Sequence, residues 1–133
     1  MIKRISLTLI FILLFSALFT GCGKQTAQKT YKIELEANET TGYRWVYYLS
    51  SEDIVTVKGE YIPDENKKGL VGVGGTQVFT VTGISEGEVI IACEYISPGE
   101  GVAEQIADYK LKVDKNLNIT EVSKTGTYFE KDK

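Results

Sequence analysis

Histidine is absent from this chain of 133 residues, and cysteine and proline each occur only twice. Without histidine, the chain lacks the usual general base of hydrolytic enzymes and the commonest protein ligand of metal ions. It also cannot form the Ser-His or Cys-His pairs on which most nucleophilic catalysis depends. The composition therefore argues against an enzyme, and we expect neither a metal site nor a cofactor.

Other routes to catalysis have little support in the sequence. Glu94 and Glu100 are a carboxylate pair that could serve a glycosidase, but acidic side chains at strand ends are by default solvated. Cys93 follows an apolar run at 89–92, where a free cysteine is more often a small buried hydrophobe than a nucleophile. The glycine-rich stretch 72–75 lacks the following lysine and helix of a phosphate-binding loop. We expect no catalytic residue.

Positive charge is also scarce, since 15 Lys and Arg residues stand against 18 Asp and Glu residues, for a net charge of −3. Nucleic acids and anionic lipid surfaces are bound through clusters of basic residues. No such cluster is evident, so neither is expected as a direct partner.

The N-terminus is typical of an export signal. Lys3 and Arg4 precede an apolar stretch at 5–19, which is too short to span a membrane as a helix. The stretch ends at Thr20-Gly21-Cys22-Gly23, which resembles the lipobox of bacterial lipoproteins, although Phe19 replaces the usual leucine. An ordinary secretory signal is the alternative, and either reading takes the protein out of the cytoplasm.

The lipobox resemblance implies cleavage before Cys22 and acylation of its thiol, which would anchor the exported protein at the cell membrane surface. Residues 1–21 are then a lipoprotein signal peptide, and the small polar residues 22–30 a lipidated tether. Cys93 has no partner for an internal disulfide once Cys22 is acylated. The remaining chain has the size of one domain, and we expect a monomer.

Short segments rich in β-branched and aromatic residues alternate between polar and apolar positions with a period of two, which predicts strands. They lie at 31–36, 43–49, 54–61, 77–82, 88–96, 105–113 and 117–122. Glycine and polar residues separate them, with a long exposed loop expected at 63–75. We predict an all-β immunoglobulin-like β-sandwich of about seven strands over residues 31–123, followed by a tail at 124–133.

One loop is conspicuous because polar, turn-forming residues are followed directly by aromatic residues. Taken alone, a well-made turn between two strands explains it. It reads Asn38-Glu39-Thr40-Thr41-Gly42-Tyr43-Arg44-Trp45. The chain also carries Gly72-x-Gly74-Gly75 with Phe79 after it, and then Tyr95-x-x-Pro98. In order and spacing these three motifs, over residues 31–114, resemble those of the chagasin-type cysteine protease inhibitors.

The resemblance implies a binding module that inhibits papain-like cysteine proteases by placing three loops in the active-site cleft. It implies that the tip at 40–42 sits over the protease's catalytic cysteine, with loops 72–75 and 95–100 on either side. The protease-binding residues are then Asn38, Thr40, Thr41, Gly42, Gly72, Gly74, Gly75 and Pro98. From the alternation of the strand, we expect Tyr43 and Trp45 to fill the core beneath the loop.

Two departures from the family pattern keep a second function open. Glu39 stands where the family usually has proline, and Ser97 and Gly99 stand where it has arginine and tryptophan. Arginine and tryptophan are typical hot-spot residues of interfaces. The alternative is therefore a structural or adhesive surface lipoprotein that kept the sandwich but lost inhibition.

Overall fold

The computed structural model of the chain describes residues 29–65 and 68–132, with backbone only for 130–132. The predicted signal peptide, Cys22 and most of the tether lie outside the described residues. The described part of the chain contains seven strands and two 3-10 segments: β1 (Thr30–Ala37), η1 (Glu39–Thr41), β2 (Arg44–Leu49), β3 (Val55–Pro63), β4 (Gly75–Gly83), β5 (Gly87–Ile96), β6 (Ala103–Val113), β7 (Ile119–Thr125) and η2 (Thr127–Asp132). Within these residues, no helix has the length and apolarity needed to cross a membrane.

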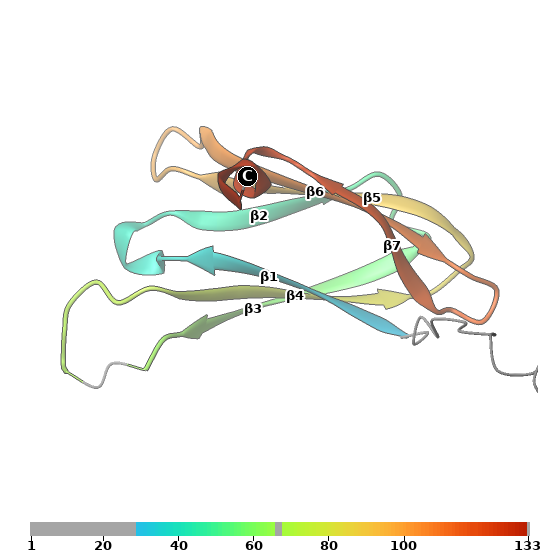
Figure 1. The fold of residues 1–133 in the computed structure, drawn as a ribbon, viewed down its shortest axis with the longest axis horizontal. Helices are drawn as coiled ribbons and strands as arrows, with labels where there is room; N and C mark the ends of the chain where they lie inside the picture. Colours follow the sequence, from blue (N-terminus) through green and yellow to red (C-terminus); the bar gives the residue numbers. More distant parts are fainter. Residues whose placement is uncertain (1–28, 66–67, 133) are drawn as a thin grey trace, which may run out of the picture.

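The strands form two antiparallel sheets that pack face to face (Figure 1). One sheet has the order β1-β4-β3 and the other the order β2-β5-β6-β7. Two-sheet packing buries one face of each strand, which is what the period-two alternation requires. The predicted immunoglobulin-like β-sandwich is confirmed, with all seven strands at the expected places.

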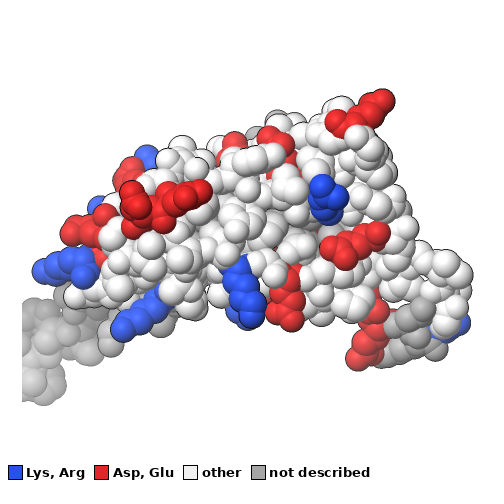
Figure 2. Space-filling model, turned by 180° about the vertical axis from the view of Figure 1, so that it is seen from behind, with Lys and Arg blue, Asp and Glu red and all other residues white. Residues whose placement is uncertain are grey.

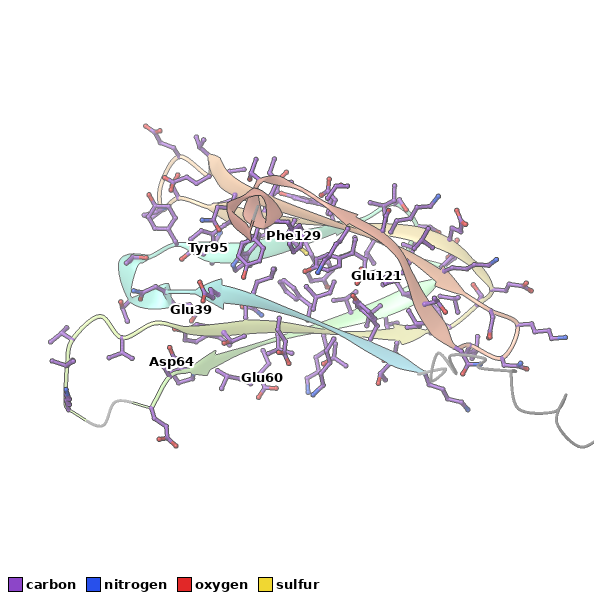
Figure 3. The ribbon with its side chains drawn as sticks, in the orientation of Figure 1. Glu39, Glu60, Asp64, Tyr95, Glu121 and Phe129 are labelled. Atoms are coloured by element: carbon purple, nitrogen blue, oxygen red, sulfur yellow. The ribbon has the colours of Figure 1, made fainter. Side chains whose placement is uncertain are left out.

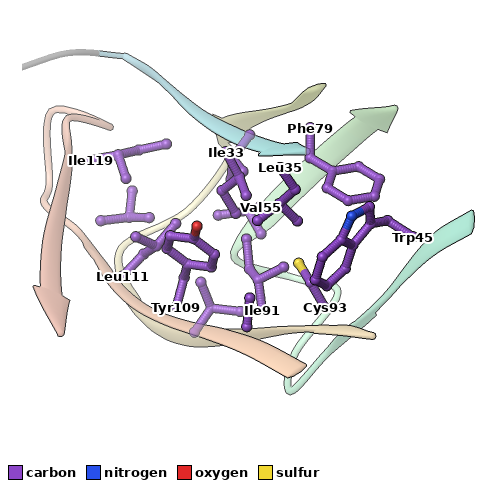
Figure 4. Packing of buried hydrophobic residues seen from close by; sticks show 14 of the residues in the cluster. Ile33, Leu35, Trp45, Val55, Phe79, Ile91, Cys93, Tyr109, Leu111 and Ile119 are labelled. Atoms are coloured by element: carbon purple, nitrogen blue, oxygen red, sulfur yellow. The ribbon is translucent and has the colours of Figure 1, made fainter. Parts of the chain in front are cut away.

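The core between the sheets is mainly aliphatic and includes the aromatic side chains of Trp45, Phe79 and Tyr109 (Figure 4). Ile33 and Leu35 of β1 face Ile91 of β5 and Leu111 of β6, and each of these side chains is at most 1% exposed. Burying an aliphatic side chain of this size contributes about 2 kcal/mol, so this cluster is a main source of stability in the described sandwich, whose cysteine, Cys93, is free.

The C-terminal part of the chain belongs to the sandwich, which differs from the tail predicted at 124–133. Strand β7 continues to Thr125, and Tyr128 and Phe129 of η2 pack against the core. The charged residues at the end of the sequence hide this, because only two aromatic residues precede them. The described core residues all lie between Tyr31 and Phe129, so a chain of residues 23–133 retains the core.

The long loop is shorter than predicted at both ends. Pro63 and Gly75 form the last residue pair of β3 and β4, and Gly75 is buried. The loop itself covers residues 64–74, and the Asp64 N–H closes it by donating to the Gly74 carbonyl oxygen at 2.9 Å. The expectation that Gly75 belongs to an exposed loop was therefore wrong, because glycine at this position lets two strands approach closely.

Candidate functional site

Three loops lie together at one end of the sandwich (Figure 1). The first loop, residues 38–43, joins β1 to β2; the second, residues 64–74, joins β3 to β4; the third, residues 97–102, joins β5 to β6. We call this end the loop end. Strand β1 begins at the opposite end, so the chain enters the domain far from these loops.

The first loop is held by hydrogen bonds around Asn38. The Asn38 Oδ1 atom accepts from the Thr40 N–H at 3.2 Å and from the Thr40 hydroxyl at 2.5 Å. The Thr41 hydroxyl donates to the Asn38 carbonyl oxygen at 2.6 Å. Gly42 ends the 3-10 turn with φ +84°, a left-handed conformation that favours glycine. The side-chain cap therefore fixes the loop without the proline that Glu39 replaces.

These hydrogen bonds determine what the tip offers to a partner. Thr40 and Thr41 are exposed, but both hydroxyl hydrogens are engaged within the loop. A hydroxyl has only one hydrogen to donate. The tip therefore presents threonine methyl groups and hydroxyl lone pairs, supported by a closed network.

Asn38 also links the first loop to the second, and Gly42 brings the first loop against the third. The Asn38 Nδ2 amide donates to the Gly72 carbonyl oxygen at 3.1 Å. A Cβ atom added at Gly42 would lie 3.1 Å from Cβ of Pro98. The structure thus brings the three predicted motifs into contact as one surface.

Aromatic rings under the first loop join it to the core. The Tyr95 hydroxyl accepts from the Asn38 N–H at 3.0 Å. The Tyr95 ring, labelled in Figure 3, lies 5.4 Å from the Tyr43 ring and 5.1 Å from the Trp45 ring. Trp45 is 4% exposed, as expected for a core residue. Tyr43 is only partly buried, and its hydroxyl donates to Glu104 at 2.7 Å. That carboxylate raises the pKa of Tyr43. Because Tyr43 is only partly buried and is not part of the core cluster, the expectation of a core position was wrong for it.

The predicted site residues differ in accessibility. Thr40, Thr41, Gly42, Gly72 and Pro98 are exposed, whereas Asn38 and Gly74 are partly buried and Gly75 is buried in β4. The first group can touch a partner directly. Asn38 supports the loops, and Gly75 serves the sheet.

Two apolar residues of the second loop were not predicted as part of the site. Leu70 and Val71 are exposed, Val71 completely so, at the loop end. Exposed apolar side chains on a loop carry a solvation cost that contact with a partner removes. The signal was present, because the pair lies between Gly69 and Gly72 and follows a run of charged and polar residues at 64–68.

Charges at the loop end are mostly negative (Figure 2). The acidic residues in or beside the three loops are Glu39, Asp64, Glu65, Glu100 and Glu104, whereas the described basic residues there are Arg44 and Lys68. Opposite charges across an interface speed association and select partners. This end therefore favours partners whose own surface is basic.

Cys93 is 0% exposed, and burial, followed by the charge of Asp108, raises its pKa to about 12. The thiolate is the reactive form of cysteine. Among residues 29–65 and 68–132, no three His, Cys, Asp or Glu residues are grouped so as to hold a metal ion. The described sandwich thus gives Cys93 the environment of a structural residue.

We expect Cys93 to be inert in the native protein. At pH 8, a chain of residues 23–133, in which it is the only cysteine, should react with a disulfide reagent at least about a thousandfold more slowly when folded than in guanidinium. Stopped-flow absorbance measures both rates. Rapid labelling of the folded chain would revive Cys93 as a candidate nucleophile.

Comparison with known proteins agrees with this geometry. A family profile described as "Chagasin family peptidase inhibitor I42" matches residues 25–113. Chagasin from Trypanosoma cruzi is 33% identical over 75 residues, which is 53% of this chain and 66% of chagasin. Amoebiasin-1 from Entamoeba histolytica is 36% identical over 67 residues, 50% of this chain and 64% of that protein. The matches thus span just under two thirds of either relative.

A solved structure shares the fold. The crystal structure of the cysteine protease inhibitor EhICP2 from Entamoeba histolytica superposes with a TM-score of 0.57 at 20% sequence identity. The superposition covers 65% of this chain and 80% of that one.

The fold is a β-sandwich that presents three joined loops at one end. The matched residues extend over most of this sandwich and include all three loops. The chain belongs to the chagasin family of peptidase inhibitors, I42. Proteins of this family are inhibitors of peptidases and not themselves enzymes.

Proposed function

We propose that this protein is a reversible inhibitor of papain-like cysteine proteases that occludes their active-site cleft with the three loops. The family is one of peptidase inhibitors, and the chagasin-type inhibitors that the motifs resemble act on this class of protease. The observation that carries the proposal is the Asn38 side chain, which joins the first and second loops through Thr40 and Gly72.

The physical basis is preorganisation. A loop that is already fixed loses little conformational entropy when it binds, so more of the contact energy appears as affinity. The cap at Asn38 and the Tyr95 ring beneath it fix the first loop before binding. A closed turn tip also presents no extended backbone of the kind that a protease cleaves, so it would block the cleft without being a substrate.

Two exposed apolar residues of the second loop support inhibition despite the altered third loop. Ser97 and Gly99 cannot supply the contacts of the arginine and tryptophan that the family pattern has there. Leu70 and Val71 are exposed at the same end of the sandwich. In this proposal the second loop carries a larger share of the binding energy than the third.

We further propose that the protein is exported and is lipid-anchored at a bacterial membrane surface through Cys22. The support is the lipobox-like sequence at 20–23. The position of β1, which begins at the end opposite the loops, is compatible with this anchor, because a tether there would leave the loop end free. Mass spectrometry of the protein from membranes tests the anchor, and an unmodified N-terminus would contradict it.

The inhibitor proposal is tested by titrating residues 23–133 against papain and a cathepsin L-type enzyme. A Thr40→Ala/Thr41→Ala double variant should weaken reversible inhibition about tenfold, because it removes two methyl groups at the tip and both donors to Asn38. The matched Thr40→Ser/Thr41→Ser variant keeps the donors and separates the two contributions.

The outcomes of the titration are distinct. Nanomolar inhibition that the alanine variant weakens would support the proposal and would show that the altered third loop is tolerated. Folded wild type without any effect at high micromolar concentration would contradict it. That result would instead favour an adhesive or structural surface protein.

A further inference from the structure

The C-terminal segment of residues 126–129 is docked against the sandwich by specific contacts. The Thr127 hydroxyl oxygen accepts from the Ile106 N–H of β6 at 3.0 Å. Gly126 has φ +137°, and a Cβ atom there would overlap the Ile106 carbonyl oxygen. Only glycine allows this close approach. The segment is therefore held at one place on the sandwich.

The aromatic rings of this segment pack against the aromatic rings beneath the loop end. The Tyr128 ring meets the Trp45 ring edge-on at 5.5 Å and the Phe129 ring at 5.2 Å. Phe129, labelled in Figure 3, in turn meets the Tyr109 ring at 5.6 Å. Aromatic pairs of this geometry contribute beyond simple burial. Trp45 also contacts Tyr95, the ring that supports the first loop. The C-terminus thus reaches the first loop through packed rings.

A hydrogen bond makes the connection direct. The Glu36 N–H donates to the Tyr128 hydroxyl oxygen at 3.2 Å, and the Glu36 carbonyl oxygen accepts from Trp45 Nε1 at 2.8 Å. Strand β1 lies at the edge of its sheet, so these two main-chain groups have side chains as partners in place of a neighbouring strand. Glu36 is two residues before Asn38. The end of β1 that carries the first loop is therefore held in part by Tyr128 of the C-terminal segment.

We propose that Tyr128 is a positioning residue, which holds the end of β1 and with it Asn38 in the geometry that the first loop needs to bind a protease. Tyr128 lies outside residues 25–113, which the family profile matches. The inference rests on the proposed inhibitory function for its consequence in binding. Its structural part concerns only the coupling of Tyr128 to the first loop.

The hydrogen bond between Tyr128 and Glu36 should affect dissociation of the protease complex more than its association. Tyr128 is partly buried beneath the loop end and is not one of the loop residues that would enter a cleft. Loosening β1 lets the loop leave its bound geometry, which shortens the life of the complex. The first encounter with the protease depends on exposed charges and is unaffected.

The test compares Tyr128→Phe with Tyr48→Phe in the chain of residues 23–133. Tyr128→Phe keeps the ring and removes only the hydroxyl that accepts from Glu36, whereas Tyr48 is exposed on β2 and serves as a matched control. Amide exchange of Glu36, Thr40 and Gly42 is followed by NMR, and kon and koff against papain by surface plasmon resonance. For Tyr128→Phe, exchange and koff should both rise about fivefold, with kon unchanged.

The results separate this inference from the proposed function. Unchanged amide exchange in Tyr128→Phe, or faster exchange with unchanged koff, would overturn the positioning role. A similar acceleration in Tyr48→Phe would also overturn it. If the wild type inhibits no protease while exchange in the first loop still accelerates in Tyr128→Phe alone, the inhibitory function fails and the coupling of Tyr128 to the loop is upheld.

Discussion

Replacing Asn38 with alanine is expected to weaken protease inhibition about a hundredfold while leaving the sandwich folded. The side chain makes hydrogen bonds to the Thr40 N–H, the Thr40 hydroxyl and the Gly72 carbonyl oxygen. Removing all three leaves the first loop without its cap and separates it from the second loop. The core is untouched, because Asn38 is only partly buried and lies outside it.

Two further variants separate the roles of Asn38. Asn38→Ser supplies a capping oxygen but lacks the amide that reaches Gly72, so it should restore part of the inhibition. Asn116→Ala removes an exposed asparagine from the turn between β6 and β7 and should change nothing. Inhibition constants and circular dichroism are measured for each variant. Wild-type inhibition by Asn38→Ala would show that the loop network has no part in binding.

Replacing Gly75 with alanine is expected to destabilise the domain by about 3 kcal/mol or more. A Cβ atom at this position would lie 2.5 Å from the Ile62 carbonyl oxygen and 2.6 Å from the Tyr61 hydroxyl. The tyrosine hydroxyl can move, but the carbonyl belongs to the neighbouring strand. Strand β4 is central in its sheet, so relief requires β3 and β4 to move apart.

Thermal and urea unfolding measure this effect, and the adjacent glycine provides the control. A loss of 3 kcal/mol lowers the Tm of a domain of this size by roughly 12 °C or more. At Gly74 an added Cβ would lie 3.3 Å from the Ala37 carbonyl oxygen and 3.8 Å from Asp64 Oδ2, so Gly74→Ala should stay within about 1 kcal/mol of the wild type. Equal stability of the two variants would contradict the close approach at Gly75.

Alternation along the chain predicts which face of a strand is buried, but not how deeply. Trp45 and Tyr47 lie on the same face of β2, and the sequence treats them alike. Trp45 is 4% exposed, whereas Tyr47 is 36% exposed, with its ring edge-on to Phe79 at 5.2 Å. Strand β2 is at the edge of its sheet, where part of the inward face remains open. Depth therefore depends on which neighbours a strand has.

The sequence predicted which residues meet at the loop end, but not which hydrogen bonds each of them makes. The motif residues Asn38, Gly72 and Pro98 do meet at the loop end, as the resemblance implies. The sequence contains no sign that Asn38 is the residue that joins two loops, or that the threonine hydroxyls are engaged within the first loop. Such roles depend on hydrogen-bond geometry, which requires coordinates. The predicted anchor at Cys22 stays a prediction.

The all-β class, the places of the seven strands and the three motifs could be predicted from the sequence, because side-chain periodicity and turn chemistry are local properties. Contacts between distant residues could not be predicted in this way. Asn38 and Gly72 are 34 positions apart, and Glu36 and Tyr128 are 92 apart. Contacts of this range follow from the order of strands within the sheets and from the packing of one sheet on the other. Neither strand order nor sheet packing produces a periodic pattern in the sequence.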